Sequence, residues 1–131
     1  MDQAVTLCYN MQGERAERIA ALAFGQGIQF HAVNAGEYLQ TLAALCGLEP
    51  KKALEYDGEG FSDEMMVMAF FKKGMLNRFL DGFRENGIPS VPLKAMLTEN
   101  NSRWDSLTLH NELKQEYEYF ARMQAQENEG Q

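Results

Sequence analysis

The sequence is poor in the residues and motifs that mark common catalytic and metal sites. It has two cysteines and two histidines in 131 residues, and neither histidine has a second ligand at a metal spacing such as HxxxH or HxH. A GxSxG nucleophile elbow is missing, as is a Cys-His pair with an orienting group. The "GQG" that starts at Gly25 follows a predicted helix, whereas nucleotide-binding glycine motifs follow a strand. The sequence therefore predicts no metal, no cofactor and no acyl-transfer chemistry.

Positive charge is also scarce. Twelve Lys and Arg oppose 19 Asp and Glu, which gives a formal net charge of -7. Because this charge repels phosphate backbones and anionic lipid surfaces, we expect no nucleic-acid and no membrane partner. Residues 1–12 lack the basic start and the apolar stretch of a signal peptide. Cys8 and Cys46 have no CxxC spacing and lie in apolar surroundings, which favours reduced, buried thiols in a cytoplasmic protein.

Apolar residues make up 45% of the chain, enough for one small domain with its own core. Short runs of strand-forming residues alternate with stretches of helical periodicity. The predicted strands are 4–9, 28–33, 65–71 and 90–97, and the predicted helices are 14–24, 37–46, 75–86 and 105–123. The apolar residues at helical spacing in the last helix are Leu109, Leu113, Tyr117 and Phe120.

The two halves of the chain share one order of strand, glycine turn, helix, Gly-Ile, strand and helix. The spans from Gly13 to Ile28 and from Gly74 to Ile88 differ by a single residue, which predicts an internal duplication or a pseudo-twofold fold. We expect one domain over 1–123, with halves 4–47 and 65–123 joined by the loop 48–64, and a flexible tail over 124–131. A loop of that length is usually functional or mobile.

The order of the strands follows from their composition. The run "MMVMAFF", Met65–Phe71, is apolar at every position, which is typical of a central strand covered on both faces. Pro89 and Pro92 cannot donate ladder hydrogen bonds, so the last strand belongs at an edge. We predict a three-layer α/β sandwich with a mostly parallel four-stranded sheet of order 2-1-3-4 and helices on both faces. Right-handed crossovers that run outward would place the first and third helices on opposite faces.

The alternative is a ferredoxin-like α+β fold, in which both crossover helices cover one face and the other face is bare. The continuous apolar run at 65–71 and the extra helix between the halves argue against it.

The sandwich predicts where a ligand would bind. Open parallel sheets bind ligands beyond the carboxyl ends of their strands, at the point where the chain reverses direction. The residues expected to meet there are Asn10, Gln12, Gly13, Lys72, Lys73 and Gly74. Two helix N-termini and two lysines favour a small anion as the ligand. The plainer interpretation is that the lysines form a solvated turn and the glycines only allow the chain to turn.

Lys94 is the candidate for chemistry. A desolvated lysine near the end of its strand could hold a carboxylate or form a Schiff base, and Trp104 could wall a small pocket beside it. Lysine and proline on an edge strand also prevent edge-to-edge pairing, and the sequence favours that role. Turn chemistry likewise explains the Asn and Ser residues at 100–102.

The second half of the chain, over about residues 60–120, resembles a family of small bacterial proteins known only as a domain of unknown function. The shared pattern is a "GIP" turn, a "PLKA" strand, a Thr, an Asn and a Trp, here Gly87-Ile88-Pro89, Pro92-Leu93-Lys94-Ala95, Thr98, Asn101 and Trp104. The resemblance implies an α/β domain and supplies no activity, cofactor or catalytic residue. It does make Lys94, Thr98, Asn101 and Trp104 positions to test.

Three functional hypotheses follow. The first is a non-catalytic binding or regulatory module for a small anionic ligand or a protein partner. The second is a small enzyme that uses Lys94 in a pocket with Thr98, Asn101 and Trp104. In the third, the sheet edges or the methionines pair subunits into a dimer.

Overall fold

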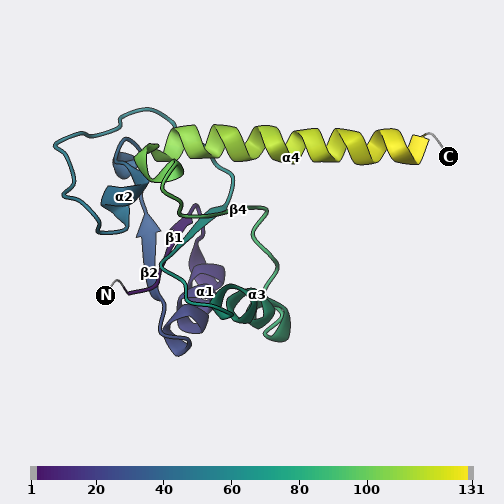
Figure 1. Cartoon of the computed structure of the whole chain (residues 1–131), viewed down its shortest axis with the longest axis horizontal. Coiled ribbons are helices and arrows are strands. Elements are labelled where there is room, and N and C mark those ends of the chain that lie inside the picture. Colours follow the sequence, from purple (N-terminus) through teal and green to yellow (C-terminus); the bar gives the residue numbers. More distant parts are fainter. Residues whose placement is uncertain (1–2, 130–131) are drawn as a thin grey trace.

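A four-stranded sheet with helices on both faces forms the body of the protein (Figure 1). The structure is a computed structural model that describes residues 3–129. The strands are β1 (Val5–Tyr9), β2 (Gln29–Val33), β3 (Met65–Ala69) and β4 (Leu93–Met96). The helices are α1 (Gly13–Gly25), α2 (Leu42–Leu45), α3 (Met75–Glu85) and α4 (Ser106–Glu129), with the short 3-10 helices η1 (Ala35–Glu37) and η2 (Asn101–Arg103). The sheet order is β2-β1-β3-β4, which confirms the predicted α/β fold and strand order.

Burial shows why β1 and β3 are central. Every residue of these two strands is buried, because each strand is covered on both faces. β2 and β4 are the edge strands, and Pro92 directly precedes β4. β1 is parallel to β2 and β3 is parallel to β4, whereas β1 and β3 are antiparallel. The sheet is therefore mostly parallel, with one antiparallel pair at its centre.

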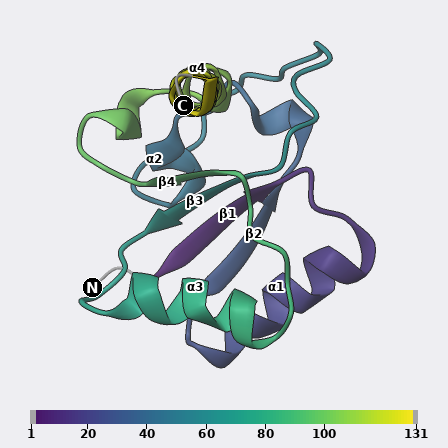
Figure 2. The same cartoon turned by 90° about the vertical axis from the view of Figure 1, so that its right-hand side faces the viewer.

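The crossover helices α1 and α3 lie on the same face of the sheet, so the prediction of opposite faces is wrong (Figure 2). Ile19 and Ala23 of α1 share one buried cluster with Phe79 and Phe83 of α3. The cause is the antiparallel pairing of β1 with β3. The chain passes from β1 outward to β2 in the first half, and from β3 outward to β4, at the other edge of the sheet, in the second half. The strands of the second half also run in the opposite direction to those of the first half. Two right-handed crossovers then fall on one face.

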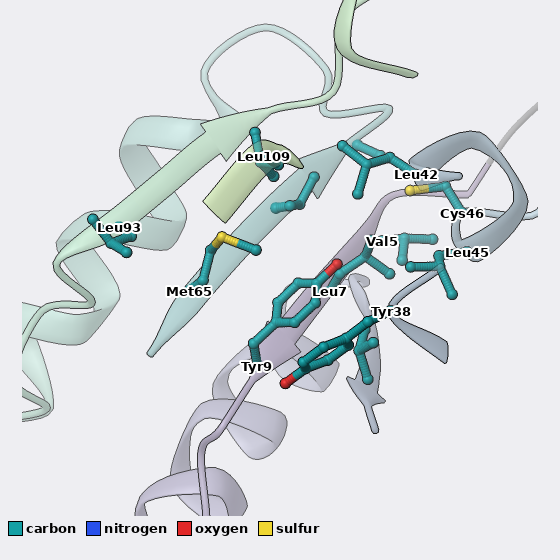
Figure 3. Close-up of a cluster of buried hydrophobic side chains, with 13 residues drawn as sticks. Val5, Leu7, Tyr9, Tyr38, Leu42, Leu45, Cys46, Met65, Leu93 and Leu109 are labelled. Carbon is teal, nitrogen blue, oxygen red and sulfur yellow. The ribbon is translucent and has the colours of Figure 1, made fainter. Parts of the chain in front are cut away.

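The other face is covered by α2, by part of the loop 48–64 and by the start of α4 (Figure 2). The core on this side includes Tyr9 of β1, Tyr38, Leu42 of α2 and Leu109 of α4 (Figure 3). Because both faces are covered, the protein has three layers. The ferredoxin-like alternative, which leaves one face bare, does not describe it.

The two strand-helix-strand halves agree in their local geometry. Each central strand is followed by a non-glycine residue in the left-handed region, Asn10 at φ 64° and Phe70 at φ 63°. The same hydrogen bond closes both crossover helices, from Ile28 N to Ala23 O at 2.8 Å and from Ile88 N to Phe83 O at 2.7 Å. The two halves thus share these local features, and the internal duplication or pseudo-twofold fold stays a prediction.

The continuous helix predicted at 37–46 is wrong. The chain instead forms η1, a turn and then the short α2. Asn34 and Glu37 close a capping box around η1, and the Thr41 hydroxyl accepts a hydrogen bond from Ala44 N at 3.1 Å to start α2. Two separate caps therefore divide one predicted helix into two pieces.

The last helix is longer than predicted. α4 continues past Met123 to Glu129, over residues where the sequence predicts a flexible tail. The last two residues of that predicted tail, 130–131, lie outside the described part of the chain.

Candidate functional site

The two glycine turns predicted to form an anion crevice do not meet. In the antiparallel pairing of β1 with β3, Tyr9 lies opposite Met65. The carboxyl ends of these strands are therefore at opposite ends of the sheet, and so are the turns that follow them, at Gly13 and Gly74. Asn10 and Gln12 accompany the first turn, whereas Lys72 and Lys73 are exposed in the second. The predicted meeting point is wrong, and anion binding at either turn alone stays a prediction.

The sheet also separates Lys94 from Trp104. Lys94 pairs with Met66 of β3, and paired residues of neighbouring strands point to the same face. That face is the one covered by α1 and α3, whereas Trp104 packs against the core on the opposite face. The Lys94 ammonium donates a 2.6 Å hydrogen bond to the carbonyl of Val91. The predicted pocket between lysine and tryptophan is therefore not formed.

The polar residues between β4 and α4 are used by the turn itself. Asn101 Oδ1 accepts a 2.8 Å hydrogen bond from Thr98 N, while Asn101 N donates to Thr98 Oγ1 at 3.1 Å. Asn101 Nδ2 also donates to the carbonyl of Met96 at 2.9 Å. Asn101 is only 8% exposed, so these bonds occupy its side chain within the protein. Turn chemistry accounts for both Thr98 and Asn101.

A polar cluster that the sequence did not predict fastens α4 to the body. His110 Nε2 lies 2.9 Å and Lys114 Nζ 3.1 Å from Asp63 Oδ2. The His110 ring stacks on Phe61, with ring centres 3.9 Å apart. The Asn10 amide donates to the carbonyls of Phe61 and Asp63 at 2.9 and 2.8 Å. The end of β1, the end of the loop and the start of α4 are thereby joined.

This cluster makes the stability of the fold depend on pH in the acid range. Hydrogen bonds from His110 and Lys114 hold the pKa of Asp63 below its usual value. A lowered pKa means that the carboxylate stabilises the folded state above its unfolded pKa of about 3.9. That contribution is lost as the pH falls through the folded pKa. Its size is reduced by solvent screening, because the Asp63 side chain is 37% exposed.

Replacing Asp63 with asparagine should therefore make the free energy of unfolding less sensitive to acid. The variant should be less stable than the wild type at neutral pH, and the gap should close between about pH 5 and about pH 2. Urea unfolding across that range measures both chains. A gap that stays constant as the pH falls would contradict the ion pair.

Beyond Lys114, α4 projects away from the body (Figure 1). The helix is anchored by Leu109, which is 1% exposed, and by the half-buried Leu113. We call residues 115–129 the free half of α4. Its large apolar side chains are 42–65% exposed: Tyr117, Tyr119, Phe120 and Met123.

The exposed side chains continue the stripe that packs against the core. Leu109, Leu113 and Phe120 recur at spacings of four and seven, so they lie on one face of the helix. Tyr117 and Met123 extend this stripe, which we call the α4 stripe, along the free half. An exposed row of aromatic and sulfur-containing side chains is typical of an interaction surface. The α4 stripe is therefore the candidate site.

Other parts of the structure are weaker candidates for a functional site than the α4 stripe. Phe24, at the end of α1, is 86% exposed beside a groove of about 630 Å³ that also includes Ile28 and Phe30, but it is a single exposed aromatic. The described residues 3–129 contain no group of three His, Cys, Asp or Glu placed to hold a metal ion. None of the helices in this part of the chain is both long enough and apolar enough to cross a bilayer.

Comparison with known proteins identifies part of the chain. Residues 64–120 match the model of a family described as "Domain of unknown function (DUF3783)", a span that includes β3, α3, β4 and the anchored part of α4. No curated protein and no solved structure matches the chain. The match ends inside the α4 stripe, at Phe120. The resemblance seen in the sequence is confirmed: residues 64–120 correspond to a domain of unknown function.

Proposed function

We propose that this chain is a non-catalytic protein-binding module and that the α4 stripe is its docking surface. The observation that carries the proposal is the continuation of a core-facing stripe onto a half-helix that the body does not cover. Aromatic side chains of this kind dominate the binding energy of protein interfaces when a partner buries them.

The energetics of an isolated helix support this assignment. Helices in water gain most of their stability from packing an amphipathic face, and a single unpacked stretch of this length is marginal. The free half of α4 has the apolar face but no packing partner among the described residues. A partner that covers Tyr117 and Phe120 would supply the missing burial, at roughly 25 cal/mol for each Å² of apolar surface.

The buried nucleophiles support a non-catalytic role. Burial raises the pKa of the Cys8 thiol to about 12 and that of Cys46 to about 11, so both stay protonated at neutral pH. The Tyr9 hydroxyl lies in the core, hydrogen-bonded to Ser106 Oγ at 2.7 Å, and burial raises its pKa. None of these groups is placed to attack a substrate.

Site-specific photo-crosslinking in cells tests the proposal. A photoreactive phenylalanine analogue at position 120 should give a covalent adduct with a partner protein. The same analogue at position 24, which replaces an equally large and more exposed phenylalanine, is the matched control and should give no such adduct. The proposal fails if position 120 gives no adduct, or if the same adduct forms from both positions.

A further inference from the structure

The α4 stripe carries carboxylates along its length. Glu116 lies one helical turn before Phe120, and Glu127 lies one turn after Met123. Residues three or four apart share a helix face, so both glutamates lie on the face of the stripe. Glu112 lies one turn before Glu116 and extends the same row towards the body. All three glutamates are exposed.

The basic residues of this region do not balance the glutamates. Lys114 is two positions from Glu116, a spacing that places residues on different sides of a helix. Arg122 lines a shallow hollow together with Phe120 and with Glu112, Glu116 and Glu118, so one positive charge there faces three negative ones. Lys114 is also already paired with Asp63, at 3.1 Å. The docking surface therefore combines exposed aromatic rings with negative charge.

We infer that the partner docked on the α4 stripe is a basic amphipathic helix; this inference rests on the proposed function. A helix partner places apolar side chains at i, i+3, i+4 and i+7, so its apolar face can run along Tyr117, Phe120 and Met123, which recur every three residues. Lysine or arginine residues beside its apolar face would lie against the row of glutamates. Opposite charges of this kind speed association and set the register of two helices.

A second copy of this chain fits the same surface poorly. In an antiparallel pair centred between Tyr119 and Phe120, Glu112 of one copy lies opposite Glu127 of the other. In a parallel pair each glutamate lies opposite itself. In these two registers carboxylates lie opposite one another, and each copy adds a net charge of -7. Charge complementarity thus selects a basic partner over self-association.

Binding of two designed peptides to the full chain tests the inference. Both peptides are amphipathic helices of about 20 residues with the same leucine positions, one with lysine and one with glutamate at the polar positions. The lysine peptide should bind, with an affinity that falls as salt increases, and the glutamate peptide should not. Fluorescence anisotropy of labelled peptide measures each affinity.

Matched variants separate the α4 stripe from general attraction between opposite charges. Phe120→Ala should weaken binding of the lysine peptide about tenfold or more, since it removes a central anchor, whereas Phe24→Ala should not change it. The double variant Glu116→Gln, Glu127→Gln should weaken binding and flatten its salt dependence. The double variant Glu17→Gln, Glu85→Gln removes the same charge from exposed sites on α1 and α3 and should bind as the wild type does.

The inference is overturned if both peptides bind alike, or if the two double variants lose affinity equally. It is also overturned if light scattering shows a dimer of the chain that Phe120→Ala dissociates, because the occupant is then a second copy. Failure of the lysine peptide, together with a crosslinked partner at position 120, would reject the basic helix and leave the proposed function standing. If the lysine peptide does not bind and position 120 gives no crosslinked partner, both the basic-helix inference and the proposed function are rejected.

Discussion

Replacing Phe79 with alanine is expected to lower the free energy of unfolding by about 3–5 kcal/mol. Phe79 lies between α3 and the sheet and is 0% exposed. Its ring packs edge-on against Phe83, with ring centres 5.3 Å apart, and against Phe71 at 5.9 Å. Truncation removes these contacts and leaves a cavity that a closely packed core fills only partly. Chemical denaturation of the two chains measures the loss.

Phe24 provides the matched control for this change. Phe24 lies on α1, the other crossover helix, and its side chain is 86% exposed. Phe24→Ala should change the free energy of unfolding by no more than about 0.5 kcal/mol. Similar losses from the two variants would contradict the burial of Phe79 or the exposure of Phe24.

Replacing Leu109 with alanine should cost about 2–5 kcal/mol, because this side chain anchors α4 in the core. The same change at Phe120 removes a larger side chain from the same helix. Phe120 is 65% exposed, so its loss should alter the free energy of unfolding by no more than about 0.5 kcal/mol. The smaller residue should thus have the larger effect, and urea unfolding of both variants measures it.

A large loss of stability from Phe120→Ala would contradict this view of α4. It would mean that the ring is buried in solution, by the body of the protein or by another copy. Repeating the measurement over a range of protein concentrations distinguishes these cases, since only burial by a second copy depends on concentration.

The sequence predicted the sheet well because burial has a clear signature in it. The unbroken apolar run at Met65 and the proline before β4 identify a central and an edge strand, and the strand order follows. The helix faces were wrong because composition does not reveal whether β1 and β3 are parallel. That single pairing decides where α1 and α3 lie and whether the turns at Gly13 and Gly74 meet.

The candidate site was predictable only in part. The helical spacing of Leu109, Leu113 and Phe120 is visible in the sequence, but it is equally typical of a helix packed along its whole length. The side chains of α4 are exposed after Lys114, over residues 115–127, where the helix projects past the body of the protein (Figure 1), and only the structure shows this. The contact of Asp63 with His110 joins residues far apart in the chain, and no local sequence pattern predicts it.

The central claim is that the free half of α4 belongs to an interface with a partner and contributes little to the fold. The most direct test is the free energy of unfolding of a chain that ends at Gln115, compared with that of the full chain. Leu109, Leu113 and the Asp63 cluster all remain in the shortened chain. We expect a difference of no more than about 1 kcal/mol. A loss of about 3 kcal/mol or more would show that the free half of α4 is part of the fold and would contradict its assignment to an interface.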